Sequence, residues 1–94
     1  MTMTELRDRI QKGLNKRPLD ASIQFDCGDE GAITLIGDTA YLEDRPADCT
    51  LHISRPDLER LLSGKLNPMT AFATRRIKVS GDMKAALKLA QVLK

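Results

Sequence analysis

The chain has 94 residues, of which 41% are hydrophobic and 30% charged, so it has the size and composition of one small globular domain and is not a disordered chain. No apolar run approaches the roughly 18 residues that a membrane-spanning helix needs. Charged residues within positions 1–9 also break up any apolar core of a secretory signal. We therefore expect residues 1–94 to form a single cytoplasmic domain.

The net charge of +2 is unevenly distributed along the chain. Residues 1–54 contain six Lys/Arg and ten Asp/Glu, giving −4, whereas residues 55–94 contain nine Lys/Arg and three Asp/Glu, giving +6. A basic second part suits a transient anionic membrane surface or the anionic headgroup of a ligand, although a solvated helix surface explains the same charges. With no Trp, two Phe and one Tyr, the chain lacks a stacking platform, so nucleic acid is not an expected partner.

The first part of the chain predicts a helix followed by strands. Residues 3–15 predict an amphipathic helix, because Thr2 and Glu5 form a capping-box pattern and apolar residues then recur at helical spacing. Alternation of apolar and polar side chains predicts four half-buried strands, over residues 21–27, 33–35, 40–42 and 49–53. In this pattern Ala40 and Leu42 both face inward, and Gly37 begins a tight hairpin turn before them.

The second part changes from the strand period to the helical period. Residues 58–62 and 69–73 predict two short helices, separated by a Gly-Lys-Leu-Asn-Pro segment that suits a helix end and a helix start. In the second of these helices Met69, Phe72 and Ala73 share a face. Residues 77–79 predict a final strand, and Asp82 then caps a helix over residues 83–94.

The last predicted helix has an apolar face wider than the stripe of about 100° by which a helix usually packs on a sheet. Its apolar positions are Met83, Ala86, Leu87, Leu89, Ala90, Val92 and Leu93. Packing against the first helix would cover this face. A second copy of the chain that hides Leu89, Val92 and Leu93, or a bound lipid, would cover it equally well.

The chain resembles the sterol carrier protein type 2 (nonspecific lipid-transfer) domain family: the order of its predicted elements agrees over nearly the whole chain, and the matching motifs lie within residues 47–82. The matching segments are Ala47-Asp48-Cys49-Thr50-Leu51-His52-Ile53-Ser54, Leu61-Leu62-Ser63-Gly64-Lys65-Leu66-Asn67-Pro68, Ala71-Phe72 and Ile77-Lys78-Val79-Ser80-Gly81-Asp82. The chain departs from the family pattern before the last strand, where Arg75-Arg76 replace the usual Gly-Lys. The resemblance implies an α+β fold, with a five-stranded, mostly antiparallel sheet, helices packed on one face and an apolar tunnel between the two layers.

The resemblance further implies non-catalytic binding and transport of a hydrophobic small molecule, such as a fatty acid, an acyl-CoA, a sterol or a phospholipid. Burying apolar ligand surface is worth roughly 25 cal/mol per Å² before association costs, and this energy has no directional preference. No cofactor is needed for it. The candidate lining residues are Leu62, Leu66, Met69, Phe72, Met83 and Leu87 from the helices, with Phe25 and Leu35 from the sheet. The alternative function is a protein-interaction or oligomerisation module, in which a partner or a homodimer buries the apolar face of the C-terminal helix.

The polar residues do not predict an enzyme. His52 is the only histidine, and strand alternation turns it away from the core and away from Cys49, so we expect no nucleophilic triad. Cys27 and Cys49 take inward positions, where cytosolic cysteines are most often buried free thiols, although neighbouring strands leave a disulfide open. Neither the cysteines nor the acidic residues have the spacing of a zinc or calcium site.

Overall fold

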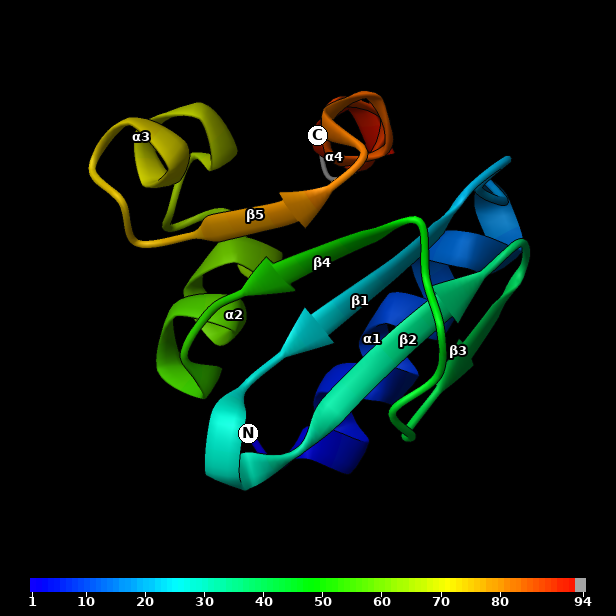
Figure 1. Cartoon of the computed structure of the whole chain (residues 1–94). Coiled ribbons are helices and arrows are strands. Elements are labelled where there is room, and N and C mark those ends of the chain that lie inside the picture. The colour runs from blue at the N-terminus through cyan, green and yellow to red at the C-terminus, as the bar shows by residue number, and fades with distance from the viewer. Residues whose placement is uncertain (93–94) are drawn as a thin grey trace.

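The computed structural model describes residues 1–92, which form four α-helices, one short 3₁₀ helix and five strands (Figure 1). The helices are α1 (Met3–Lys16), α2 (Arg55–Leu62), α3 (Pro68–Ala73) and α4 (Met83–Val92). The strands are β1 (Ser22–Asp26), β2 (Ala32–Ile36), β3 (Thr39–Tyr41), β4 (Cys49–His52) and β5 (Lys78–Gly81), with the 3₁₀ helix η1 (Gly28–Glu30) after β1. Residues 93 and 94 of the predicted last helix lie outside the described residues.

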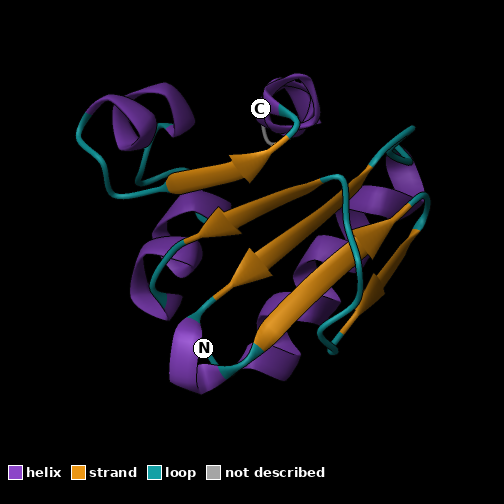
Figure 2. Cartoon of the chain, viewed as in Figure 1, coloured by secondary structure: helices purple, strands orange, loops and turns teal. Residues whose placement is uncertain are grey.

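The five strands form one mixed sheet in the order β3-β2-β1-β4-β5 (Figure 2). The pairs β1–β2, β2–β3 and β4–β5 are antiparallel, and the central pair β1–β4 is parallel. The α+β class and the predominance of antiparallel pairs are therefore confirmed. The parallel pair requires a long connection between β1 and β4, and β2 and β3 lie within it.

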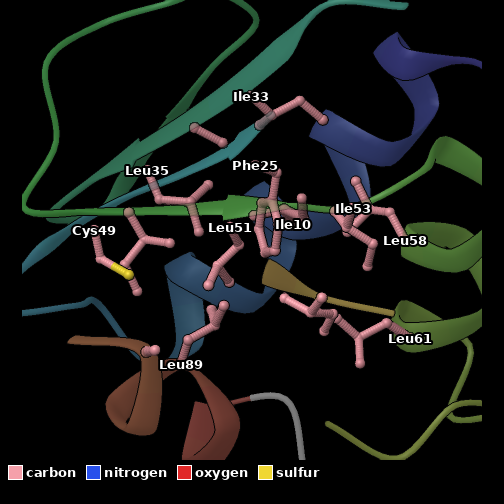
Figure 3. Close-up of a cluster of buried hydrophobic side chains, with 14 of the residues drawn as sticks. Ile10, Phe25, Ile33, Leu35, Cys49, Leu51, Ile53, Leu58, Leu61 and Leu89 are labelled. Atoms are coloured by element: carbon pink, nitrogen blue, oxygen red, sulfur yellow. The ribbon is translucent and has the colours of Figure 1, made fainter. Parts of the chain in front are cut away.

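The strand register gathers the apolar side chains on one face of the sheet. Ile23 lies beside Leu35 and Cys49, and Phe25 lies beside Leu51 on β4. Since side chains alternate along a strand, these residues share one face. The helices α1, α2 and α4 bury their own apolar residues in the same cluster, part of which Figure 3 shows. The helical residues are Leu6, Ile10, Leu14, Leu58, Leu61, Ala85, Ala86 and Leu89.

The opposite face of the sheet is polar and is crossed by the segment of residues 42–48, which joins β3 to β4 (Figure 1). Two buried polar side chains anchor this segment: Gln24 Nε2 donates to Asp44 Oδ1 at 2.6 Å, and Thr34 Oγ1 donates to the Glu43 carbonyl at 2.7 Å. The inward orientation predicted for Leu42 is wrong, because β3 ends at residue 41 and the chain leaves the sheet there. Leu42 is 45% exposed.

The predicted turns and caps are largely confirmed. Thr2 forms the capping box of α1, Ser54 Oγ accepts from the backbone of Asp57 at the start of α2, and Asp82 Oδ1 accepts from the Lys84 backbone at 2.9 Å in α4. In α3, the face that was expected to be shared by Met69, Phe72 and Ala73 is not the face that packs against the core. Ala71 is the fully buried residue of α3, whereas Met69 and Ala73 are exposed.

Both cysteines are buried free thiols, as the inward strand positions predict. Cys49 on β4 lies beside Ile23 on β1, whereas Cys27 comes four residues after Ile23, just beyond the end of β1. At about 3.3 Å per strand residue, the two cysteines are separated by about 13 Å along the strand direction. A disulfide needs Cα atoms within roughly 7 Å of each other, so the register excludes one.

Candidate functional site

A small apolar cavity lies between the sheet and the helices α2, α3 and α4. Its volume is about 10 Å³, and it is lined by Leu51, Leu61, Pro68, Phe72, Ile77, Ala86 and Leu89. We call it the apolar cavity. A space of this size accommodates about one water-sized probe and no acyl chain. The apolar tunnel expected between the layers therefore stays a prediction. The cavity marks where side chains from β4, α2, α3 and α4, with Ile77 just before β5, fail to fill the interior.

Each wall of the apolar cavity follows from a local sequence pattern. Leu51 is an inward residue of β4, and Ala86 and Leu89 are three residues apart on α4, so both face the sheet. Asn67 caps α3, with its Oδ1 accepting from the Met69 backbone at 2.8 Å, and this places Phe72 toward the sheet one turn later. The small Ala86 side chain leaves part of the space unfilled.

The structure divides the eight predicted lining residues among three environments. Phe72 lines the apolar cavity. Phe25 and Leu35 are fully buried in the packed core, and Leu62 and Leu66 are partly buried against that core. The other three are largely exposed: Met69 by 62%, Met83 by 54% and Leu87 by 51%. The structure thus brings one of the eight to the cavity wall.

Six of the seven cavity residues were not predicted as lining. The signal for Ala86 and Leu89 was present, because both lie on the over-wide apolar face of the last helix. Leu51, Leu61 and Ile77 were recognised only as core positions. Pro68 had the pattern of a helix start and gave no indication of a ligand-facing role. Which core residues border unfilled space depends on how the helices dock, and a linear pattern does not contain that information.

The outer surface of α4 combines apolar and basic side chains. Met83 and Leu87 lie one turn apart and are more than half exposed. Lys84 and Lys88 are also exposed, and Lys88 Nζ lies 3.0 Å from Asp20 Oδ1. Leu89, in contrast, is only 4% exposed and is used within the chain, so it does not offer a surface to a second copy. The side chain of Val92 and residue 93 lie outside the described part.

His52 points outward, as predicted, but has two partners that the sequence did not indicate. Its Nδ1 lies 3.4 Å from Asp26 Oδ2, and its Nε2 lies 3.3 Å from Ser80 Oγ. The strand register brings the three residues together on the polar face of the sheet. Both distances exceed the 2.6–3.2 Å of a working base–nucleophile pair, and the imidazole and carboxylate are solvated. The contacts orient the imidazole on an open surface and give no enclosed site for a substrate.

Iodoacetamide should alkylate Cys27 slowly at pH 8, because burial raises the pKa of its thiol from 9.0 to about 11, with a further contribution from Glu30 and Asp26. The reactive thiolate is then about a hundredfold scarcer than in a peptide. Mass spectrometry after tryptic digestion would follow Cys27 separately from Cys49. Because the folded state keeps this proton to higher pH than the unfolded state, stability should fall as pH rises from 9 to 11. A rate profile with its midpoint near 9 would contradict the buried environment of Cys27.

Among the described residues, no helix has the length and apolar character needed to cross a membrane. A model of the SCP-2 sterol transfer family matches residues 3–94. The chain is 45% identical over 53 residues to sterol carrier protein 2 of Gallus gallus; the match covers 56% of the chain but 10% of that relative. It is also 36% identical over 47 residues to hydroxysteroid dehydrogenase-like protein 2 of Bos taurus, covering 50% of the chain and 11% of the relative.

A similar fold occurs in the solution structure of palmitated SCP2L2 from Aedes aegypti, with a TM-score of 0.79 and 19% sequence identity. That similarity covers 99% of this chain and 95% of the other, and at this identity it establishes the fold alone. The chain spans about a tenth of the length of the curated relatives it matches. Since the family model covers nearly every residue, the chain belongs to the SCP-2 sterol transfer family, whose domains bind and transfer lipids.

Proposed function

We propose that residues 1–94 form one sterol-carrier-like domain that binds a hydrophobic small molecule and carries it through the cytosol without transforming it. The observation that carries this proposal is the apolar cavity between the sheet and α2, α3 and α4. The ligand is an acyl lipid (a fatty acid, an acyl-CoA or a phospholipid) or a sterol. Because a relative of the same fold is described as palmitated, a saturated fatty acid is the first probe to use.

Ligand uptake requires the cavity to widen. Among the helices that border it, α3 contributes the fewest buried side chains, so it is the helix that we expect to move. This helix has six residues, and Ala71 is its one fully buried side chain. Phe72 is only partly buried, so an outward movement of α3 would open the cavity between Phe72 and the buried residues Leu51 and Leu61 on the facing elements. Each buried CH₂ group of the ligand is worth about 0.8 kcal/mol, so an acyl chain would offset a small opening cost.

The exposed apolar residues would act at the mouth of the site. We assign Met69, Met83 and Leu87 to the first contact with the ligand or with a membrane that donates it. Methionine adapts to irregular guests because its side chain is unbranched and flexible. Lys84 and Lys88, exposed on the same helix as Met83, would favour a transient contact with an anionic membrane surface. Leu62 and Leu66 would join the wall as the cavity widens.

A non-catalytic role is supported by the chemistry of the cavity wall. All seven lining residues are apolar, and none has a titratable or nucleophilic side chain. A ligand held there would meet no group able to act as general acid, base or nucleophile. The polar contacts of His52 lie on the other face of the sheet.

Ala86→Leu should weaken the binding of a fluorescent fatty acid by about tenfold or more, because three added carbons occupy the space that the ligand needs. Titration at micromolar protein concentration, with native mass spectrometry to count ligands, would measure this. The matched control is Ala73→Leu, since Ala73 is exposed on α3 and is not part of the cavity wall. The control should bind like the unmodified chain. Absence of saturable binding by the unmodified chain would overturn the proposal.

The alternative function, a protein-interaction or oligomerisation module, is favoured by one observation, the exposure of Met83 and Leu87 on α4. A partner or a second copy would then cover these two side chains. Light scattering of the unmodified chain and of a Met83→Ser/Leu87→Ser variant distinguishes this function. A stable dimer that the double substitution dissociates, together with no lipid uptake, would favour interaction over transport.

A further inference from the structure

The two edge strands of the sheet differ in how the rest of the chain covers them. β3 lies at one edge and β5 at the other (Figure 1). At the β3 edge, Gln11 of α1 bonds to the strand and its turn: its Oε1 accepts from the Ala40 backbone at 2.8 Å, and its Nε2 donates to the Asp38 carbonyl at 2.6 Å. Within residues 1–92, no side chain bonds to the backbone of β5 in this way. An edge strand without such cover can pair with a further strand.

The hydrogen bonds at the end of β5 identify which of its backbone groups point outward. Asp82 N donates to the Asp48 carbonyl of the facing segment at 2.9 Å. Hydrogen-bonded positions alternate along an antiparallel pair, so the residues two and four positions before Asp82 also bond to β4. The N–H and C=O groups of Val79 and Gly81 therefore point away from β4. Across the described part of the chain, no other segment bonds to these four groups.

The outward backbone groups are accessible to solvent. Gly81 is exposed, and because it has no side chain, its exposed surface is backbone. Val79 lies opposite Leu51 and is partly buried against the core, so its side chain is on the face that the helices cover. Lys78 and Ser80 are exposed and lie on the polar face. A strand added at this edge would alternate in the same way, with apolar side chains beside Val79 and polar side chains beside Lys78.

The charge at this edge determines which kind of strand would fit. Residues 74–81 contain Arg75, Arg76 and Lys78 and no Asp or Glu, and the three cations border one solvent-open pocket. Arg76 Nη1 lies 3.2 Å from Asp57 Oδ1, whereas Arg75 and Lys78 form no ion pair within residues 1–92. A second copy of β5 would place the same cations against these, and like charges on neighbouring strands repel. An acidic strand would instead supply the missing counter-charges.

We propose that the open edge of β5 binds an extended acidic segment of a partner protein by strand addition. The backbone of that segment would bond to the outward N–H and C=O groups of Val79 and Gly81, and its carboxylates would lie beside Lys78 and Arg75. The backbone bonds supply affinity for any extended chain, and the cations supply the preference for Asp and Glu. None of residues 78–81 lines the apolar cavity, so the inference is independent of lipid binding and adds a protein partner to the proposed function.

The test titrates the isotope-labelled chain with a short peptide in which Glu and Val alternate, and follows amide hydrogen exchange by NMR. The amides of Val79 and Gly81 should exchange more slowly when the peptide is bound, because they become hydrogen-bonded. A peptide with Lys in place of Glu should bind about tenfold more weakly or worse. A Glu-Val peptide with every backbone nitrogen methylated should not bind, because it offers no N–H donor to the edge.

An Arg75→Gly/Lys78→Gln variant should bind the Glu-Val peptide about tenfold more weakly than the unmodified chain. Arg75 has φ +60°, a conformation that glycine adopts without strain, so this variant should remain folded. The matched control is Lys12→Gln, which removes an exposed cation from α1. The control should bind the peptide like the unmodified chain.

Slower exchange at Val79 and Gly81, together with a preference for the acidic peptide, would support the inference. Equal affinity for the Glu and Lys peptides would overturn it, as would binding that leaves both amides unprotected or no binding at all. A dimer detected by light scattering without peptide, in which these two amides are already protected, would also overturn it, because a second copy would then occupy the edge. Each of these outcomes leaves the fatty-acid titration as an independent test of lipid binding.

Discussion

Gly81→Ala should lower the free energy of unfolding by about 3–4 kcal/mol, measured by urea denaturation. Gly81 ends β5 at φ +96°, where a Cβ atom would lie 2.4 Å from the Asp48 carbonyl oxygen and 3.2 Å from Cys49 Cα. Both are backbone atoms, so relief requires β5 to move away from β4. That movement would also break the 2.9 Å hydrogen bond from Asp82 N to the Asp48 carbonyl, which fixes the start of α4.

The matched control is Gly37→Ala in the turn between β2 and β3. Gly37 has φ +61°, and a Cβ atom there would meet no atom within 4 Å. This variant should lose about 1–2 kcal/mol, the cost of the left-handed conformation alone. Equal losses for the two variants would show that the close approach of β4 and β5 at Gly81 does not limit stability.

Phe25→Ala should cost about 3–5 kcal/mol, because Phe25 is fully buried at the centre of the core. Phe72→Ala should cost less, about 2–3 kcal/mol, because Phe72 is only partly buried. The two variants differ in where they create space. Removing the Phe72 ring enlarges the apolar cavity, so excess fatty acid should restore more stability to this variant than to the unmodified chain.

Thermal denaturation with and without fatty acid would measure both responses. If the ligand lies against Phe72 rather than Phe25, fatty acid should raise the denaturation midpoint of Phe25→Ala by as much as that of the unmodified chain. A larger ligand-induced gain in stability for Phe25→Ala than for Phe72→Ala would indicate that the ligand lies closer to the sheet. If fatty acid does not stabilise Phe72→Ala, then Phe72 does not line the ligand site.

The elements of this fold are largely predictable because their signals are local. The two-residue period places Ile23, Phe25 and Leu51 on one face whatever the strand order, and capping residues such as Thr2 fix helix starts through bonds to the next turn. The parallel pairing of β1 with β4 has no such signal, because it joins segments that lie far apart in the sequence. The same holds for Leu42, whose exposure depends on where the chain leaves the sheet.

The candidate site is less predictable than the fold. Apolar periodicity identified Met83 and Leu87 as parts of an over-wide helix face. The docking of α4 turns Ala86 and Leu89 toward the sheet, however, and leaves Met83 and Leu87 exposed to solvent. Arg75, which follows α3 at φ +60°, is marked in the sequence only as a departure from a family pattern. Its position follows from how α3 ends, through hydrogen bonds to residues three and five positions earlier.

An isotope-filtered NMR experiment on the methyl-labelled chain with a saturated fatty acid tests the central claim most directly, since it reports which methyl groups lie beside the acyl chain. Contacts from the acyl chain to the methyl groups of Leu51, Leu61 and Leu89 are the predicted result, because these side chains line the apolar cavity. Contacts confined to the exposed Met83 and Leu87, or none at all, would contradict the account and leave the interior closed to ligand.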